Sequence, residues 1–407
     1  MNRRLLLHGV TSGLLLNFLP WQDFQAKNQK LLGYIRTNWS REPYTYGSYS
    51  HIPKGASRKD IRALEQPIDK KIFFAGEATF PKHNSTVHAA YESGIRAANS
   101  ILQSHADRIA IIGAGMSGLA SAHKLSTNGR EVTVFEARDR IGGRIWTDDR
   151  LGVPLELGAS WIHGINGNPL VDLAEGLDQR LIETEKEDYI IRGGGGRKIR
   201  DSDAPGWLEN VVSIQHTAGT NADRINQWAY LFVNDYDGPD VIFPDGYAGI
   251  LAAFKGDYKI KLNTLVKEIS RTQKGVTLGF EKINNQSFDA VLVTVPLGVL
   301  KREDIKFNPV LPKNKQRAID RLVMGTLDKV YLLFDQPFWD LSTTWILTPE
   351  NDLPPGQFNQ WFNLYPYIKE PIIMVLNGGP PALALSALSD EDIVQRALQT
   401  IYTAYSV

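Results

Sequence analysis

A glycine-rich loop between an apolar strand and a helix is the feature that most constrains the fold of this chain. The glycines recur as Gly113-x-Gly115-x-x-Gly118 directly after the apolar run 108–112, and a second apolar run, 131–135, follows the predicted helix. In such a loop the first glycine allows a tight turn, the second lets the backbone approach a pyrophosphate, and the third lets the helix pack on the sheet. The pattern predicts a βαβ unit in a nucleotide-binding α/β domain.

An acidic residue completes this unit. Glu136 follows the second strand, 18 residues after Gly118. At this place a carboxylate can accept hydrogen bonds from the ribose hydroxyls of an adenosine. A glycine-rich turn without a ligand is the alternative, but strand, loop, helix and acid together make the dinucleotide context nearly complete.

Composition narrows the class of partner. The 407 residues are enough for two domains. Lys+Arg and Asp+Glu each total 45, so no overall field is directed at nucleic acid or an anionic membrane, and we expect neither as a partner. The chain has no cysteine, which excludes disulfides, thiolate metal sites and cysteine nucleophiles. No convincing metal-binding or Ser-His-Asp constellation is present, and we expect no bound metal.

The first 29 residues form a distinct segment. Arg3-Arg4 precedes an apolar stretch, 5–19, that is too short and too interrupted by polar residues for a stable membrane span. A twin-arginine export signal is one interpretation, and it implies the bacterial periplasm or secretion. A partly ordered leader or amphipathic helix on a cytoplasmic protein is the other.

Further runs predict the remaining elements. Strands are expected at 31–36, 71–75, 259–270, 289–295 and 329–334, a helix at 86–102 opened by Asn84-Ser85, and a final amphipathic helix capped by Ser389 and Asp392. Residues 170–246 lack strand–helix alternation and are expected to form a separate lobe. Within it, Gly193–Gly196 predicts a hairpin turn, because a phosphate loop would need a following helix.

The residues after Glu136 carry a family resemblance. Gly142-Gly143-Arg144 and the stretch 156–164, Glu-Leu-Gly-Ala-Ser-Trp-Ile-His-Gly, resemble the flavin-containing amine oxidases. In that family the Gly-Gly-Arg turn approaches the pyrophosphate and ribityl chain. The Trp-Ile-His-Gly stretch reaches the flavin and the substrate tunnel. The resemblance implies FAD as the cofactor.

A lysine on a late strand fits the same resemblance. Residues 324–330, followed by Phe338-Trp339, look like the family's catalytic-lysine region. The resemblance implies that Lys329 holds a water near flavin N5, and an ammonium there can stabilise negative charge on the reduced ring. A surface strand lysine is the alternative.

Segments near the front resemble the family's C-terminal flavin half. They are Thr37-Asn38-Trp39, Gly47-Ser48-Tyr49 and the segment 76–88. The resemblance implies that Glu77 accepts from a ribityl or phosphate-side hydroxyl. Thr86 and Val87, at a helix N-terminus, would direct backbone N–H groups at the N1–O2 edge of the flavin. The alternative makes 86–102 a core helix alone.

The order of these halves is unusual, because in the family the dinucleotide strand comes first and the Gly-Glu-Ala-Thr helix last. Here the closing half precedes the opening half, and a link, 103–107, joins them. We expect a circular permutation in which strand 71–75, helix 86–102 and strand 108–112 form a βαβ crossover. An assembly or gene-model artefact, or a defunct copy, is the alternative.

Three positions refine the subclass. Ser48 stands where monoamine oxidases carry the cysteine that bonds the flavin, so the resemblance implies non-covalent FAD. Thr86 replaces the second tyrosine of an aromatic cage, which leaves Tyr49 as a cage wall. His163 and Thr86 together are more similar to polyamine and spermine oxidases, although a lone histidine such as His163 is often structural.

The resemblance therefore implies a full set of site residues. The substrate side comprises Lys329, His163, Tyr49 and Trp39. The cofactor side comprises Gly76, Glu77, Thr86, Val87, Gly113, Gly115, Met116, Ser117, Gly118, Glu136, Ala137, Arg138, Gly142, Gly143, Arg144, Gly158, Ala159, Ser160, Trp161 and Val266.

The expected architecture is an FAD-binding Rossmann-like domain of the glutathione-reductase and amine-oxidase type, with an α+β substrate lobe. Residues 30–169 and 247–310 are assigned to the FAD-binding domain, and residues 170–246 and 311–407 to the substrate-binding domain. The expected reaction is oxidation of a polyamine or monoamine to an imine or aldehyde, with O2 reduced to H2O2. The alternatives are an L-amino-acid oxidase, for which no carboxylate-binding arginine is identifiable, and a flavin-binding remnant without turnover.

Overall fold

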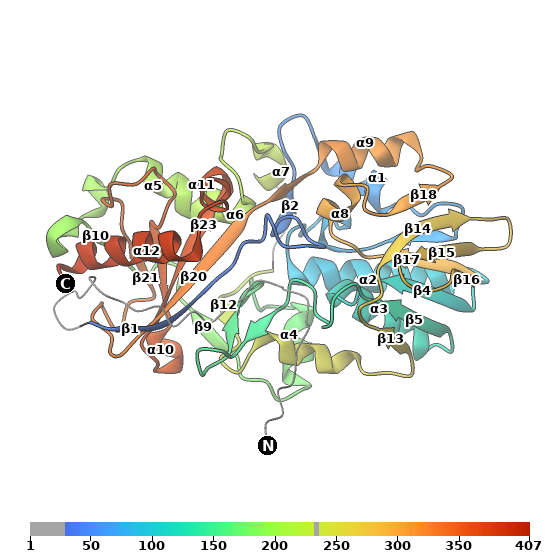
Figure 1. The fold of residues 1–407 in the computed structure, drawn as a ribbon, viewed down its shortest axis with the longest axis horizontal. Helices are drawn as coiled ribbons and strands as arrows, with labels where there is room; N and C mark the ends of the chain where they lie inside the picture. The colour runs from blue at the N-terminus through green and yellow to red at the C-terminus, as the bar shows by residue number, and fades with distance from the viewer. Residues whose placement is uncertain (1–28, 232–235) are drawn as a thin grey trace, which may run out of the picture.

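Two β-sheets lie at opposite ends of an elongated molecule (Figure 1). The computed structural model describes residues 29–231 and 236–407. The expected leader, 1–29, lies outside the described residues except for its last position. Across the described chain, every helix is too short or too polar to cross a membrane.

The first sheet is parallel and has five strands in the order β13-β5-β4-β17-β3. The strands are β13 (Lys259–Lys261), β5 (Glu131–Phe135), β4 (Arg108–Ile112), β17 (Ala290–Val293) and β3 (Ile72–Phe74). The helix α3 (Met116–Ser126) joins β4 to β5, so the predicted βαβ unit is confirmed. The predicted α/β class is confirmed with it.

Apolar layers cover both faces of this sheet. On one face α3 and α2 (Val87–Leu102) pack against Ile109, Ile111 and Leu292. On the other, Ala110 and Val291 pack against α1 (Arg58–Glu65), α9 (Lys313–Arg321) and the strands β14 (Val266–Arg271) and β15 (Val276–Phe280). The runs of apolar residues in β4 and β17 follow from this burial on both faces.

The connection from β3 through α2 to β4 differs in one respect from the expectation. Both strands are parallel members of one sheet, but β17 lies between them and pairs with each. Periodicity identifies a strand but carries no information on its neighbours, so the insertion of a strand from residues 290–293 was missed. The start of α2 also differs, because Thr86 is the N-cap and its Oγ1 accepts from Ala89 N at 3.1 Å.

The second sheet has seven strands in the order β1-β20-β23-β22-β21-β10-β11. They are β1 (Leu31–Arg36), β20 (Leu327–Phe334), β23 (Ile372–Gly378), β22 (Gln360–Asn363), β21 (Trp345–Leu347), β10 (Tyr189–Arg192) and β11 (Lys198–Ile199). The antiparallel β10–β11 pair confirms the hairpin predicted at Gly193–Gly196. The final helix, α12 (Asp390–Tyr405), packs on this sheet and is capped by Ser389 as expected.

The place of β1 departs from the sequence-based domain assignment. That assignment put residues 30–169 with the parallel sheet, whereas β1 pairs antiparallel with β20 at the edge of the seven-stranded sheet. Its Arg36 also forms an ion pair with Asp390 of α12 at 3.2 Å. Local pattern predicted the strand correctly but could not identify its partner.

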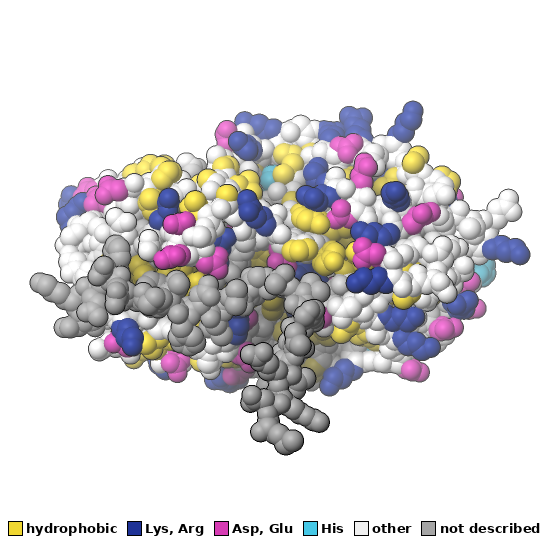
Figure 2. All heavy atoms as spheres, viewed as in Figure 1, with side chains coloured by type: hydrophobic (Ala, Val, Ile, Leu, Met, Phe, Trp, Pro, Cys, Tyr) yellow, Lys and Arg dark blue, Asp and Glu magenta, His cyan; other side chains and the backbone are white. Residues whose placement is uncertain are grey.

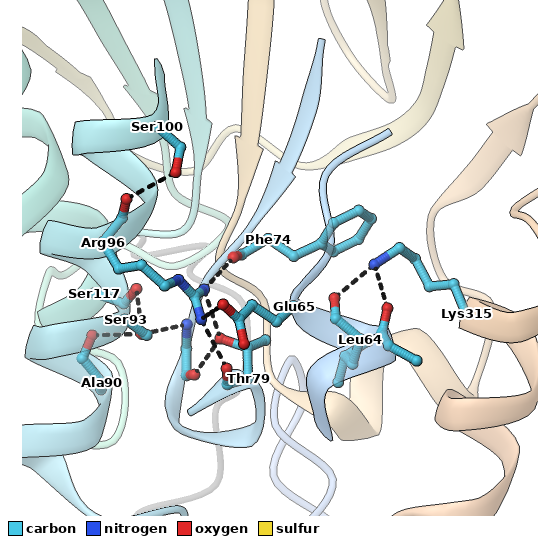
Figure 3. A network of polar contacts seen from close by, with 12 residues as sticks. Leu64, Glu65, Phe74, Thr79, Ala90, Ser93, Arg96, Ser100, Ser117 and Lys315 are labelled. Carbon is cyan, nitrogen blue, oxygen red and sulfur yellow. Dashed lines mark hydrogen bonds and ion pairs between the residues drawn. The ribbon is translucent and has the colours of Figure 1, made fainter. Parts of the chain in front are cut away.

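An arginine of α2 holds the turn that follows β3 (Figure 3). Arg96 donates to Phe74 O at 2.8 Å and to Thr79 O at 2.9 Å, and it forms an ion pair with Glu65 at 3.0 Å. Its guanidinium fork thereby satisfies backbone carbonyls on both sides of the turn 76–79.

Arg96→Ala is expected to lower the free energy of unfolding by about 2–4 kcal/mol, because it leaves buried carbonyls and Glu65 without their donor. Urea unfolding monitored by circular dichroism measures this change. Arg62→Ala, at an exposed site of α1, is the control and should change stability by less than about 0.5 kcal/mol. Equal effects of the two substitutions would contradict the role of Arg96.

Candidate functional site

A cavity of about 540 Å³ lies where the strands of the parallel sheet end. Residues that follow the ends of four strands line it, including Gly76 after β3, Gly113 after β4, Glu136 after β5 and Thr294 after β17. The carboxyl ends of strands are where open α/β sheets bind ligands, and the volume falls within the roughly 300–1,000 Å³ of small-molecule sites.

The glycine loop has the geometry that an anion site requires. Gly113 turns the chain with φ of +106°, and Gly115 is the N-cap of α3. The first N–H groups of a helix have no intrahelical partner, so the start of α3 offers donors to a negative group. A Cβ at Gly118 would lie 2.0 Å from Gly113 O, which shows that the third glycine serves packing and not the cavity wall.

Glu136 is a buried carboxylate fixed beside this loop. It accepts from Ala114 N at 2.7 Å and from Arg138 N at 2.9 Å, and only 7% of its surface is exposed. A carboxylate has about four lone-pair sites, so two backbone donors leave acceptor capacity toward the cavity.

The front segment and the Gly-Gly-Arg turn meet in an ion pair. Glu77 accepts from Arg144 Nη1 at 2.7 Å, from Ser50 Oγ at 2.6 Å and from Ser85 N at 3.1 Å. Both side chains also line the cavity. Two motifs that were identified separately in the sequence therefore form one wall of the site.

Lys329 also lines the cavity and is buried. Its Nζ donates to Glu156 O at 2.7 Å, Gly158 O at 2.5 Å and Ser160 Oγ at 2.5 Å, and 3% of the residue is exposed. Burial lowers the pKa of Lys329 to about 7, although the nearby Glu156 carboxylate opposes this effect. The alternative of a surface strand lysine is wrong.

His163 lines the cavity with half of its side chain exposed, and a buried carboxylate fixes it. Its Nδ1 lies 2.8 Å from Asp240 Oδ2, which Lys186 also contacts at 3.0 Å. Burial alone raises the pKa of Asp240, but the hydrogen bonds and charges of His163 and Lys186 lower it to about 2. No motif in the sequence pointed to Asp240.

Aromatic side chains also line the cavity together with Lys329 and His163. Trp39 donates from Nε1 to Leu157 O at 3.0 Å, and the Tyr49 hydroxyl donates to His216 O. Trp161 stacks on Trp345 with ring centroids 5.8 Å apart.

The structure brings the predicted site residues together with one exception. All of them line the cavity except Gly118, which packs behind it. Sequence reasoning missed several residues that line the cavity. They include Tyr44, Thr45, Tyr46, Thr264, Thr294, Val295, Pro296, Asp304 and Leu327. Among the residues that the structure describes, no group of three or more His, Asp or Glu is arranged to hold a metal ion.

Comparisons with known proteins agree with this geometry. The family described as "Flavin containing amine oxidoreductase" matches residues 18–102, 116–218 and 209–406. Polyamine oxidase 4 of Oryza sativa subsp. japonica is 30% identical over 348 residues, 70% of each chain. A probable polyamine oxidase 4 of Arabidopsis thaliana is 31% identical over 348 residues, 70% of this chain and 68% of its own.

Solved structures share the fold. A variant of putrescine oxidase aligns with a TM-score of 0.59 at 19% identity, over 74% of this chain and 81% of its own. Putrescine oxidase bound to putrescine aligns with a TM-score of 0.55 at 18% identity, over the same shares.

The residues present fit FAD. The helix start at Gly115 leaves open space where a pyrophosphate would approach, since the nearest atom to a Cβ there is 3.8 Å away. Buried Glu136 suits a ribose, and the absence of cysteine agrees with a non-covalent flavin. The chain therefore belongs to the flavin-containing amine oxidoreductase family, whose reaction here is FAD-dependent oxidation of an amine.

Proposed function

We propose that the chain oxidises a small-molecule amine, of the polyamine class or a monoamine, with O2 as the final acceptor. The single observation that carries this proposal is the buried Lys329 on the wall of a cavity that also contains the dinucleotide loop. When bound there, FAD would supply the redox chemistry, taking a hydride from the amine α-carbon and passing electrons to O2.

Residues at the other end of the cavity would receive the amine. Tyr49 and Trp161 offer aromatic faces, which attract a cation or an apolar chain. Asp240 holds His163 Nδ1, so Nε2 is the ring nitrogen left for a bound molecule. We assign the amine to this end and the dinucleotide to the end formed by Gly115 and Glu136.

The cofactor would be held from three directions. The start of α3 and Glu136 would hold the adenosine and pyrophosphate. The Glu77–Arg144 pair would order the turns around the ribityl chain. The N-terminus of α2, at Thr86 and Val87, would place its positive end against the flavin.

Anaerobic reduction tests the function. Purified protein should show a flavin spectrum that spermine or a simple amine bleaches without O2, and O2 should restore it with release of H2O2. Bleaching by L-amino acids alone would favour an L-amino-acid oxidase. Folded, colourless protein that FAD cannot reconstitute would overturn the proposal in favour of a flavin-free remnant.

Glu136→Ala is expected to weaken FAD binding about 10- to 100-fold, because it removes a charged acceptor that would serve the ribose. FAD titration of apoprotein, followed by flavin fluorescence, measures the change. Glu131→Ala, at the exposed start of β5, is the control. Full FAD retention in Glu136→Ala would remove Glu136 from the cofactor site.

A further inference from the structure

The three acceptors around Lys329 are not equivalent. Two are the carbonyl oxygens of Glu156 and Gly158, and the third is the hydroxyl of Ser160 at 2.5 Å. A backbone carbonyl only accepts hydrogen bonds, whereas a hydroxyl both accepts and donates. Ser160 is therefore the only one of these three contacts that can give a proton to the amine or take one from it.

This arrangement satisfies both charge states when only the Ser160 hydroxyl hydrogen turns, between Tyr331, with which the Ser160 side chain also forms a hydrogen bond, and Lys329. As an ammonium, Lys329 Nζ donates one hydrogen to each of the three acceptors. As a neutral amine, it donates to the two carbonyls and its lone pair accepts from Ser160 Oγ–H. The fixed side chain can therefore gain or lose a proton without leaving a buried polar group unpaired.

Ser160 also has the location that a relay needs. It lies between Trp161 and Ala159 on the wall of the cavity, and 9% of its surface is exposed. A hydroxyl that contacts Nζ on one side and borders the cavity can be reached by a water or amine held there.

We propose that Ser160 relays protons between Lys329 and the molecule in the cavity. The ammonium passes a proton to Ser160 Oγ while the hydroxyl proton moves to a water or amine nitrogen in the cavity, and the reverse recharges the lysine. One N–H bond of Lys329 breaks, a new O–H bond forms at Ser160 Oγ as the old one breaks, and one proton reaches the acceptor. No electrons are transferred. This inference rests on the proposed role of Lys329.

The groups that face Lys329 favour exchange near neutral pH. Burial raises the pKa of the Glu156 carboxyl and lowers that of Lys329 to about 7. Burial also raises the pKa of Tyr331, whose hydroxyl donates to Glu156 O at 2.7 Å, and of Tyr247 beyond Glu156. Burial also raises the pKa of Asp328 to about 7, but this neighbouring residue of β20 points to the other face of the strand, where it accepts from Thr37 and Trp39.

A matched pair of variants tests the relay, because Thr and Val have nearly the same shape but differ by a hydroxyl. Ser160→Thr should retain flavin reduction and reoxidation rates within about threefold over pH 6–10. Ser160→Val and Ser160→Ala should slow the step that depends on Lys329 by about tenfold or more. The rate of that step should also lose its dependence on pH. Rapid mixing with spermine, or with whichever amine bleaches the wild type, gives these rates.

A second readout needs no turnover. The absorption of the oxidised flavin is titrated with pH in the absence of amine, and the transition assigned to Lys329 is identified by its loss in Lys329→Met. Removal of the Ser160 acceptor should move that transition about one pH unit lower, because the ammonium loses a hydrogen bond. FAD content, measured in parallel, shows whether a change in this transition comes from loss of the cofactor.

The outcomes separate the relay from the proposed function. If Ser160→Val matches Ser160→Thr in rate and titration while Lys329→Met is slow, the relay is overturned and the function stands. If Lys329→Met turns over like the wild type, the role of Lys329 fails and the relay fails with it.

Discussion

Lys329→Met is expected to slow flavin reduction or reoxidation about 100- to 1,000-fold while FAD stays bound. The substitution removes the one buried ammonium that lines the cavity among the described lysines, and methionine fills a similar volume. FAD would be retained because its proposed contacts, at Gly115, Glu136 and Arg144, come from other elements. Stopped-flow absorbance of the flavin, with amine and then with O2, measures both half-reactions.

Lys315→Met is the matched control for this result. Lys315 is also buried, at 2% exposed, and it donates to Ala63 O at 3.0 Å and Leu64 O at 2.6 Å (Figure 3). It does not line the cavity, so its loss should reduce stability without changing the rate constants of either half-reaction. Equal slowing by both substitutions would show that a general loss of packing explains the effect of Lys329→Met.

Local spacing explains which parts of the fold could be predicted. The unit β4–α3–β5 follows from residues within one stretch of chain, where strand, glycine turn, helix and acid are set by neighbouring positions. The hairpin at Gly193–Gly196 and the cap at Ser389 are local in the same sense.

Pairings across long separations could not be predicted in this way. The insertion of β17 between β3 and β4, the pairing of β1 with β20, and the contact of Asp240 with His163 each join residues more than 70 positions apart. Apolar runs in β1 and β17 are compatible with either sheet, since burial on a pleated surface does not specify the neighbouring strand.

The same reasoning applies to the unusual chain order. Circular permutation relative to the family stays a prediction, and two features agree with it. The elements β3 and α2 precede β4 in the chain, yet β3 belongs to the same sheet as β4 and α2 packs on that sheet. Leu31 and Val407, at the two ends of the described chain, pack against one apolar cluster on the seven-stranded sheet. Because both ends lie on one cluster, a chain in the family's usual order could connect them and begin at another place with little change to the fold.

The exposed surface in Figure 2 agrees with a small-molecule partner more than with a polyelectrolyte. Lys and Arg side chains are interspersed with Asp and Glu over the face shown, outside the part covered by grey atoms. The equal totals of 45 basic and 45 acidic residues fit this mixture. We assign specificity to the cavity, where Glu77, Glu136 and Lys329 are buried charged groups.

Two glycines of the loop should separate folding from cofactor binding. In Gly118→Ala the new methyl would lie 2.0 Å from the backbone oxygen of Gly113, and backbone cannot yield as a flexible side chain can. We expect the apoprotein to lose at least about 2–3 kcal/mol of unfolding free energy, with FAD binding lost as a consequence. Urea unfolding of apoprotein measures the stability.

Gly115→Ala should act in the opposite way. Its φ of −81° suits any L-residue, and the nearest atom to the new methyl, Gly142 O, lies at an ordinary contact distance of 3.8 Å. The apoprotein should therefore unfold within about 1 kcal/mol of the wild type, whereas FAD should bind about 10- to 100-fold more weakly, because the methyl occupies the space that a pyrophosphate would approach. Gly206→Ala, in open space at φ of −60°, should change neither property. If Gly115→Ala binds FAD like the wild type, the pyrophosphate does not approach this turn, and the cofactor must enter the cavity in another orientation.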